Sequence, residues 1–155
     1  PTDENMGKQL ANILKEYIPF IYAPRQFQAV AYRYSTQFNE NSKSPAATNF
    51  FPEAFHNAVM AREGSEDLLC TNCVVVIKDP LEDERLSKKI GVSKDLMSEK
   101  FGRLVEVQAV GKTLLTRMMS ALLIGDFASA YLGVLYGIDP GTPESIESLK
   151  ASMKD

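Results

Sequence analysis

A glutamate and the only histidine of the chain, Glu40 and His56, are the residues best suited to moving protons near neutral pH. Glu40 stands inside a polar segment, Gln-Phe-Asn-Glu-Asn-Ser-Lys, that covers residues 37–43. His56 follows Glu53 and Phe55 in a second polar and aromatic stretch. Residue type alone is also consistent with a plainer interpretation, in which Glu40 is a solvated surface glutamate and His56 is a hydrogen-bonded structural histidine. The elements that carry the two residues therefore matter.

Helical spacing surrounds Glu40. Apolar residues recur three and four positions apart over residues 5–17, and again over residues 27–41, which predicts two amphipathic helices. At about 100° per residue, Arg33, Gln37 and Glu40 share one polar side of the second helix, beside its apolar stripe. A shorter helix is expected over residues 51–61, with Pro52 in its first turn and His56 in its middle.

Apolar and β-branched runs between the helices predict strands at residues 18–23, 73–78 and 104–110. We expect an exposed helix over residues 81–100 that breaks around Gly91, a long helix over 112–136 and a short last helix over 143–153. Strands that alternate with helices indicate an α/β fold with a parallel sheet. No internal repeat, low-complexity segment or second domain is visible.

Composition narrows the class of protein. The 155 residues suit one domain, and 45% hydrophobic with 24% charged residues is ordinary for a soluble globular protein. A net charge of −3 gives no electrostatic case for nucleic acid, which calls for a basic surface. The polar start does not resemble a signal peptide. It also lacks a methionine, which a processed start or an excised fragment would explain.

One apolar stretch, residues 118–137, is long enough to cross a membrane. Asp126 near its middle would be costly in lipid. Small residues such as Ser120, Gly125 and Ser129 suit a helix packed between protein layers instead. We therefore expect a buried helix and no membrane contact.

Cys70 and Cys73 are the only cysteines. A zinc site would need a second pair of ligands, and a redox motif would open a helix, whereas Cys73 runs directly into an apolar strand. Two reduced thiols at the entrance of a strand are the plainer interpretation. With no sign of an oxidising compartment, the cytoplasm is the expected location.

The motifs together resemble the C-terminal half of the bifunctional phosphoglucose/phosphomannose isomerases, which contain two sugar-isomerase (SIS) domains. The resemblance covers nearly the whole chain. It rests on nine short segments in five groups: Ala-Tyr-Arg at 31–33 with 37–43, Phe-Pro-Glu at 51–53 with His-Asn at 56–57, Gly-Asp-Phe at 125–127 with Tyr-Leu at 131–132, Tyr-Gly-Ile-Asp-Pro at 136–140, and Pro-Glu-Ser-Ile at 143–146 with Leu-Lys at 149–150.

This resemblance implies a three-layer α/β/α sandwich over residues 1–155, a single SIS-like domain that forms half of a two-domain isomerase. The implied reaction interconverts glucose 6-phosphate or mannose 6-phosphate with fructose 6-phosphate through a cis-enediol, without metal or organic cofactor. The implied partners are the phosphosugar, the N-terminal SIS domain of the parent protein and a second copy in a homodimer.

Roles for individual residues follow from the same resemblance. Glu40 corresponds to the base that moves a proton between C1 and C2 of the open-chain sugar. His56 corresponds to the histidine that opens the sugar ring and reaches into the partner subunit's site. Lys150 corresponds to a lysine near the ring-opening step, although a helix-surface lysine is its plain alternative. Thr142 corresponds to a threonine that makes room for both epimers.

The sequence is also consistent with two rival functions. The family's phosphate-binding Ser/Thr-rich loops are not visible here, so a non-catalytic SIS module that binds phosphosugars or mediates assembly is the first alternative. A thiol redox protein that uses Cys70 and Cys73 is the second, and it requires a low thiol pKa. We also expect the isolated chain to be inactive or nearly so.

Overall fold

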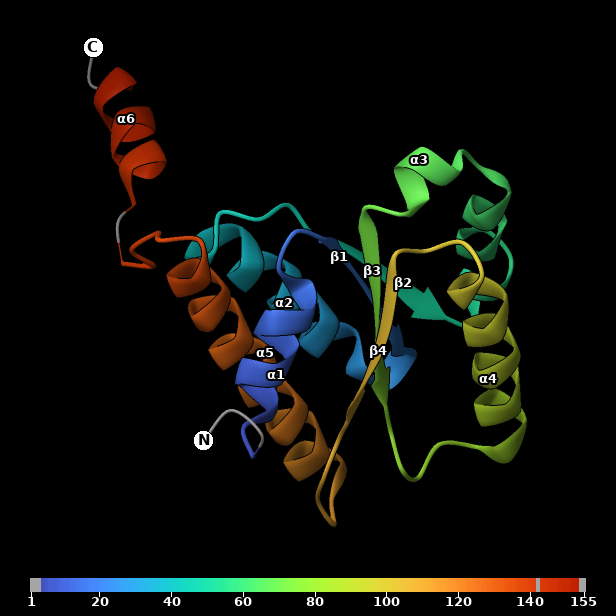
Figure 1. Ribbon diagram of the computed structural model, residues 1–155. Coiled ribbons are helices and arrows are strands. Elements are labelled where there is room, and N and C mark those ends of the chain that lie inside the picture. Colours follow the sequence, from blue (N-terminus) through green and yellow to red (C-terminus); the bar gives the residue numbers. More distant parts are fainter. Residues whose placement is uncertain (1–3, 142, 154–155) are drawn as a thin grey trace.

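The computed structural model describes residues 4–141 and 143–153, in which helices alternate with strands (Figure 1). The elements in chain order are α1 (Met6–Leu14), β1 (Ile18–Pro24), the 3-10 helix η1 (Arg25–Phe27), α2 (Gln28–Asn41), β2 (Ala47–Phe51), the 3-10 helices η2 (Glu53–Phe55) and η3 (Ala58–Glu63), α3 (Glu66–Leu69), β3 (Asn72–Lys78), α4 (Glu84–Ser98), β4 (Arg103–Gln108), α5 (Leu114–Leu135) and α6 (Glu144–Ser152).

Within the described residues, four strands form one parallel sheet in the order β2-β1-β3-β4. The register runs across the sheet from Thr48 to Ile21 and Val75, and from Val75 to Val105. β3 has a strand on each side and helices on each face, so residues 72–77 are all buried. The strands predicted at β1, β3 and β4 and their parallel arrangement are confirmed.

Helices cover both faces of this sheet (Figure 1). α1, α2 and α5 pack on one face, and α4 with η2 packs on the other. Alternate β3 residues serve the two cores: Val75 and Ile77 contact the first set of helices, and Val74 and Val76 contact the second. The predicted three-layer α/β/α sandwich is therefore confirmed.

The helix expected over residues 51–61 is wrong. The chain forms the edge strand β2 up to Phe51, and two short 3-10 helices follow it. Four of the five β2 residues are only partly buried, so the strand lacks the apolar run that reveals an inner strand. The side chain of Asn57 accepts a hydrogen bond from the Ala58 amide and begins a new turn, which separates the two 3-10 helices.

The break expected at Gly91 is also wrong, because α4 continues through it from Glu84 to Ser98. Ile90 and Met97 are buried against the sheet and anchor the helix on both sides of the glycine. A glycine in a helix interior costs only about 1 kcal/mol relative to alanine, which this burial offsets.

α5 begins with a reciprocal capping arrangement between Thr113 and Thr116 and packs closely against α2. A side chain at Gly125 would stand 2.1 Å from the Tyr34 ring, and one at Gly133 would stand 2.7 Å from the Asn41 carbonyl oxygen. The two glycines let α5 lie directly on α2, the helix that carries Glu40.

The prediction that α5 is a buried helix holds for only one side of it. Arg117, Ala121, Gly125 and Ala128 face inward and are buried, while the opposite side is exposed. Among the described residues, α5 is the one helix whose length and composition would allow it to cross a membrane. One third of its most apolar 18-residue stretch is buried inside the protein. Its inward contacts are those of an outer-layer helix in an α/β sandwich.

Candidate active site

Glu40 lies in the last turn of α2, whose orientation is fixed by its apolar side. Val30, Tyr34 and Phe38 are buried, and the Tyr34 hydroxyl donates a hydrogen bond of 2.5 Å to the Ala121 carbonyl oxygen of α5. Because these residues face the core, the polar side of α2 faces outward, and Glu40 is exposed. The side chain is therefore accessible to a ligand.

A chain of hydrogen bonds joins the Glu40 carboxylate to α5. Gln37 Nε2 lies 3.5 Å from Glu40 Oε2, and Gln37 Oε1 accepts a hydrogen bond of 3.1 Å from Asn41 Nδ2. Asn41 Nδ2 also donates to Ser129 Oγ at 2.8 Å, and Ser129 is fully buried. Gln37, which is held by Asn41 and through it by Ser129, is therefore a fixed neighbour of the Glu40 carboxylate, although the carboxylate itself faces solvent. Gln37 and Glu40 do share one side of the helix, as their spacing predicted.

Two cations lie along the same surface. Arg33 forms a bidentate ion pair with Asp126 of α5, at 3.0 and 3.1 Å. The hydrogen bond to Asp126 and its charge, with a smaller contribution from Glu40, raise the pKa of Arg33. Lys43 has φ of +55°, and its Nζ donates a hydrogen bond of 2.7 Å to the Glu40 carbonyl oxygen. Glu40 therefore stands between two positive groups.

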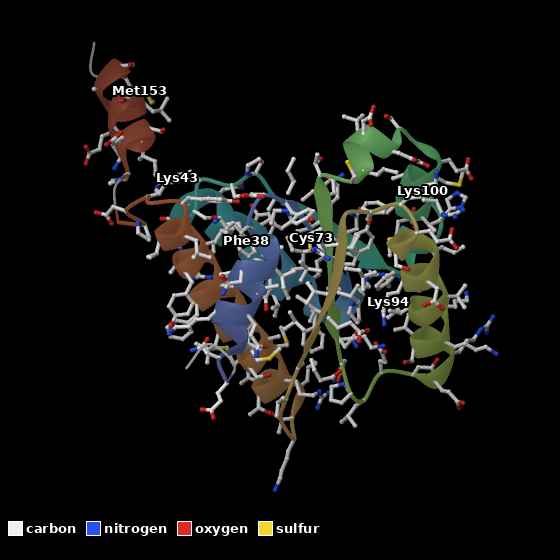
Figure 2. All side chains as sticks on the ribbon, in the orientation of Figure 1. Phe38, Lys43, Cys73, Lys94, Lys100 and Met153 are labelled. Carbon is white, nitrogen blue, oxygen red and sulfur yellow. The ribbon has the colours of Figure 1, made fainter. Side chains whose placement is uncertain are left out.

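An open cavity of about 900 Å³ adjoins Glu40. Its walls are the end of α2, the segment that follows α5, and the start of α6; Figure 2 shows Lys43 close to that connecting segment. The volume is within the range of small-molecule sites, which run from about 300 to 1,000 Å³. The residues that line the cavity are Asn39, Glu40, Lys43, Ile138, Asp139, Pro140, Gly141, Pro143, Glu144, Ser145 and Ile146.

His56 is not at this cavity. It is exposed at the end of η2, just past the carboxyl end of β2. β1 and β2 are parallel neighbours, so α2 must run back between them, and Glu40 lies at the amino end of the sheet. The length of β2, roughly 15 Å at about 3.3 Å per residue, therefore separates the two side chains. One chain does not bring them together.

Lys150 and Thr142 complete the set of sequence-predicted residues. Lys150 is exposed on α6, the helix that extends away from the sandwich, and it does not line the cavity (Figure 1). Thr142 lies outside the described residues. Of the three predicted side chains that the structure describes, only Glu40 lines the cavity.

Two features were missed from the sequence. Lys43 lies within the segment that drew attention to Glu40, yet its contact with the Glu40 carbonyl was not foreseen. Arg117 and Asp79 form a buried ion pair at the carboxyl end of β3, with Arg117 Nε 2.7 Å from Asp79 Oδ1. The sequence signal for this ion pair was Asp79, which directly follows the strand predicted at residues 73–78.

The cysteines do not form a reactive pair. Cys70 is exposed, and Cys73 is buried in β3. Burial raises the pKa of the Cys73 thiol to about 12, the opposite of what a redox cysteine requires. No group of three or more His, Cys, Asp or Glu residues within 4–141 and 143–153 is placed to hold a metal ion. The thiol redox alternative therefore loses its support.

The structure is similar to the crystal structure of a glucose-6-phosphate isomerase like protein from Thermus thermophilus, with a TM-score of 0.73 and 27% sequence identity. The superposition covers 91% of this chain and 47% of that chain. The class that the fold defines is the SIS domain, a three-layer sandwich with a parallel sheet.

Residues 3–153 match the family described as the bacterial phospho-glucose isomerase C-terminal SIS domain, and the chain belongs to this family. The chain is 32% identical over 159 residues to a bifunctional phosphoglucose/phosphomannose isomerase of Caldicellulosiruptor bescii, covering 47% of that relative. It is 37% identical over 135 residues to one of Thermoplasma volcanium, covering 42%. The chain thus spans less than half the length of these relatives.

Proposed function

We propose that this chain is the catalytic C-terminal domain of an isomerase that interconverts glucose 6-phosphate or mannose 6-phosphate with fructose 6-phosphate. The observation that carries the proposal is the position of Glu40 at an open cavity large enough to admit a hexose phosphate, in a chain of this family. Lys43, which lines the cavity, suits a substrate that carries a phosphate.

Glu40 acts as the general base in this proposal. Its carboxylate takes the proton from C2 of the open-chain aldose while the oxygen at C1 gains a proton, which produces a cis-enediol. Return of the carbon-bound proton to C1 and loss of the proton on the C2 oxygen give the ketose. Rotation about C2–C3 in the intermediate exposes either face of C2, so one base serves both epimers.

His56 opens the sugar ring, and it does so in the site of a second copy. The separation of His56 from Glu40 within one chain supports this arrangement, because a two-fold dimer can pair the amino end of one sheet with the carboxyl end of its neighbour. Lys150 supports ring opening, and Thr142 makes room for both epimers. The protein acts in the cytoplasm with an N-terminal SIS domain as its partner, and the proposal needs no cofactor.

The test uses a two-domain fusion, in which the part of the Caldicellulosiruptor bescii relative outside its match is joined ahead of this chain. We expect isomerase turnover from the fusion and little or none from the isolated chain. Glu40→Gln in the fusion should lower turnover at least about a thousandfold, because the base is lost, while sugar phosphate binding persists. Glu84→Gln, an exposed carboxamide substitution on α4, is the matched control and should leave turnover unchanged.

Unchanged turnover in the Glu40→Gln fusion would contradict the proposal. Phosphosugar binding without turnover in the unsubstituted fusion would favour the rival function, a non-catalytic binding module. Turnover by the isolated chain would contradict the expectation that the domain is incomplete.

A further inference from the structure

The outward side of α5 carries a row of exposed apolar side chains, here called the outer stripe. Four of them are spaced four residues apart, so they form a row that winds gradually around the exposed part of the helix. The members and their exposed fractions are Leu115 67%, Met119 45%, Leu123 50%, Phe127 55% and Val134 66%. Figure 1 shows α5 at the outside of its layer, away from the sheet.

The outer stripe contains no charge. The charged residues of α5 are Arg117, which is buried against Asp79, and Asp126, which pairs with Arg33 of α2 on the flank. From Leu115 to Val134 the stripe is roughly 30 Å long at about 1.5 Å per residue. Exposed apolar surface gathered along one helix is characteristic of interaction sites.

The neighbouring helices leave the outer stripe exposed. The start of α1, where any preceding part of the chain is attached, lies next to it. α1 crosses α5 where a side chain at Gly7 would lie 3.0 Å from Phe127 Cβ, and Lys8 lies over the Tyr131 ring at 5.5 Å. Met6, the first residue of α1, is 44% exposed and extends the apolar surface. A chain segment that precedes Met6 is therefore joined to this domain beside Phe127, near the middle of the outer stripe.

We propose that the outer stripe of α5 docks the domain that precedes this one in the two-domain relatives. The family is defined as a C-terminal domain and the relatives are more than twice the matched length, so their other domain is joined ahead of α1. A connection that enters at Met6 brings the preceding domain close to Phe127, and covalent tethering raises its effective concentration at the stripe. An apolar helix face of this size suits an interface between domains of one chain.

Other occupants fit less well. A second copy has no tether at this surface, and the dimer proposed above uses the edges that hold Glu40 and His56. A membrane surface favours helices with many lysines and arginines along the polar flank, whereas the flank here has the neutral pair of Arg33 and Asp126. Both occupants are distinguishable in the experiment below.

The experiment measures how fast N-ethylmaleimide labels a thiol placed in the stripe. Leu123→Cys, on a Cys70→Ser background, is compared in the isolated chain and in the two-domain fusion. Val92→Cys on α4, which covers the other face of the sheet and has 54% exposure, is the control position. Both positions are exposed, so these substitutions preserve the core, and circular dichroism verifies the fold.

We expect rapid labelling at both positions in the isolated chain. In the fusion, labelling of the Leu123→Cys variant should slow at least about tenfold, while the Val92→Cys variant keeps its rate. Equal rates for Leu123→Cys in both proteins would overturn the proposal.

Protection in the isolated chain that grows with its concentration would assign the stripe to a second copy instead, and protection by phosphatidylglycerol vesicles would assign it to a membrane. Turnover of the fusion is measured separately, so failure here leaves the assignment of Glu40 untouched.

Discussion

At the scale of single residues, Glu40 combines an exposed carboxylate with a polar neighbour on the same helix. The spacing of Gln37 and Glu40 places both on one side of α2, where their side chains lie 3.5 Å apart. The contact from Lys43 depends on a left-handed backbone just past the helix, which the pattern does not reveal. The cavity wall comes from Ile138 and Pro140, about a hundred residues further along the chain.

The two cysteines yield a prediction at this scale. N-ethylmaleimide should label Cys70 and leave Cys73 unlabelled in the native protein, because burial raises the pKa of Cys73 from 9.0 to about 12. Mass spectrometry should find one label per chain, and none after Cys70→Ser. Labelling of Cys73 without denaturant would contradict the account.

The same burial predicts how stability depends on pH. Desolvation also raises the pKa of Tyr22 to about 12 and raises that of Tyr34. An acid with a raised folded pKa binds its proton more tightly in the native state, so its stabilising contribution is complete below the unfolded pKa and is lost as pH rises. The free energy of unfolding should therefore fall from about pH 9 upward, as urea titrations at about pH 8, 9.5 and 11 can measure. A flat profile would contradict it.

At the scale of elements, the sequence predicts the buried parts well and the edges poorly. β3 is recognisable because every residue from 72 to 77 is buried, which selects β-branched and apolar types. β2 is not recognisable because, at the sheet edge, only Phe51 is fully buried. The interior of α5 was predicted, but exposure on its outer side could not be, since an apolar side chain looks the same whether a neighbour covers it or not.

Two glycines in helices should respond oppositely to alanine. A methyl group at Gly91 of α4 would have no atom within 4 Å, so Gly91→Ala should stabilise by about 0.5–1 kcal/mol through helix propensity. A methyl group at Gly125 of α5 would meet the Tyr34 ring at 2.1 Å, so Gly125→Ala should destabilise by about 1–3 kcal/mol, because the core is overpacked. Chemical denaturation measures both, and the same sign for the two variants would contradict the packing of α2 on α5.

At the scale of the whole molecule, the topology separates Glu40 and His56, the two residues proposed to move protons. Glu40 ends α2 at the amino end of the sheet, and His56 follows β2 at its carboxyl end. A site that uses both side chains requires a second copy of the chain. The sequence alone suggested this arrangement only through the family resemblance, because the distance between the residues depends on the direction of α2.

Complementation between two inactive variants tests this central claim most directly. Glu40→Gln and His56→Ala are each introduced into the two-domain fusion, and the variants are mixed after partial denaturation and refolding. If each site takes Glu40 from one copy and His56 from its neighbour, a mixed dimer holds one intact site. Random pairing should then restore about a quarter of the unsubstituted turnover. Turnover no higher than that of the separate variants would contradict the account.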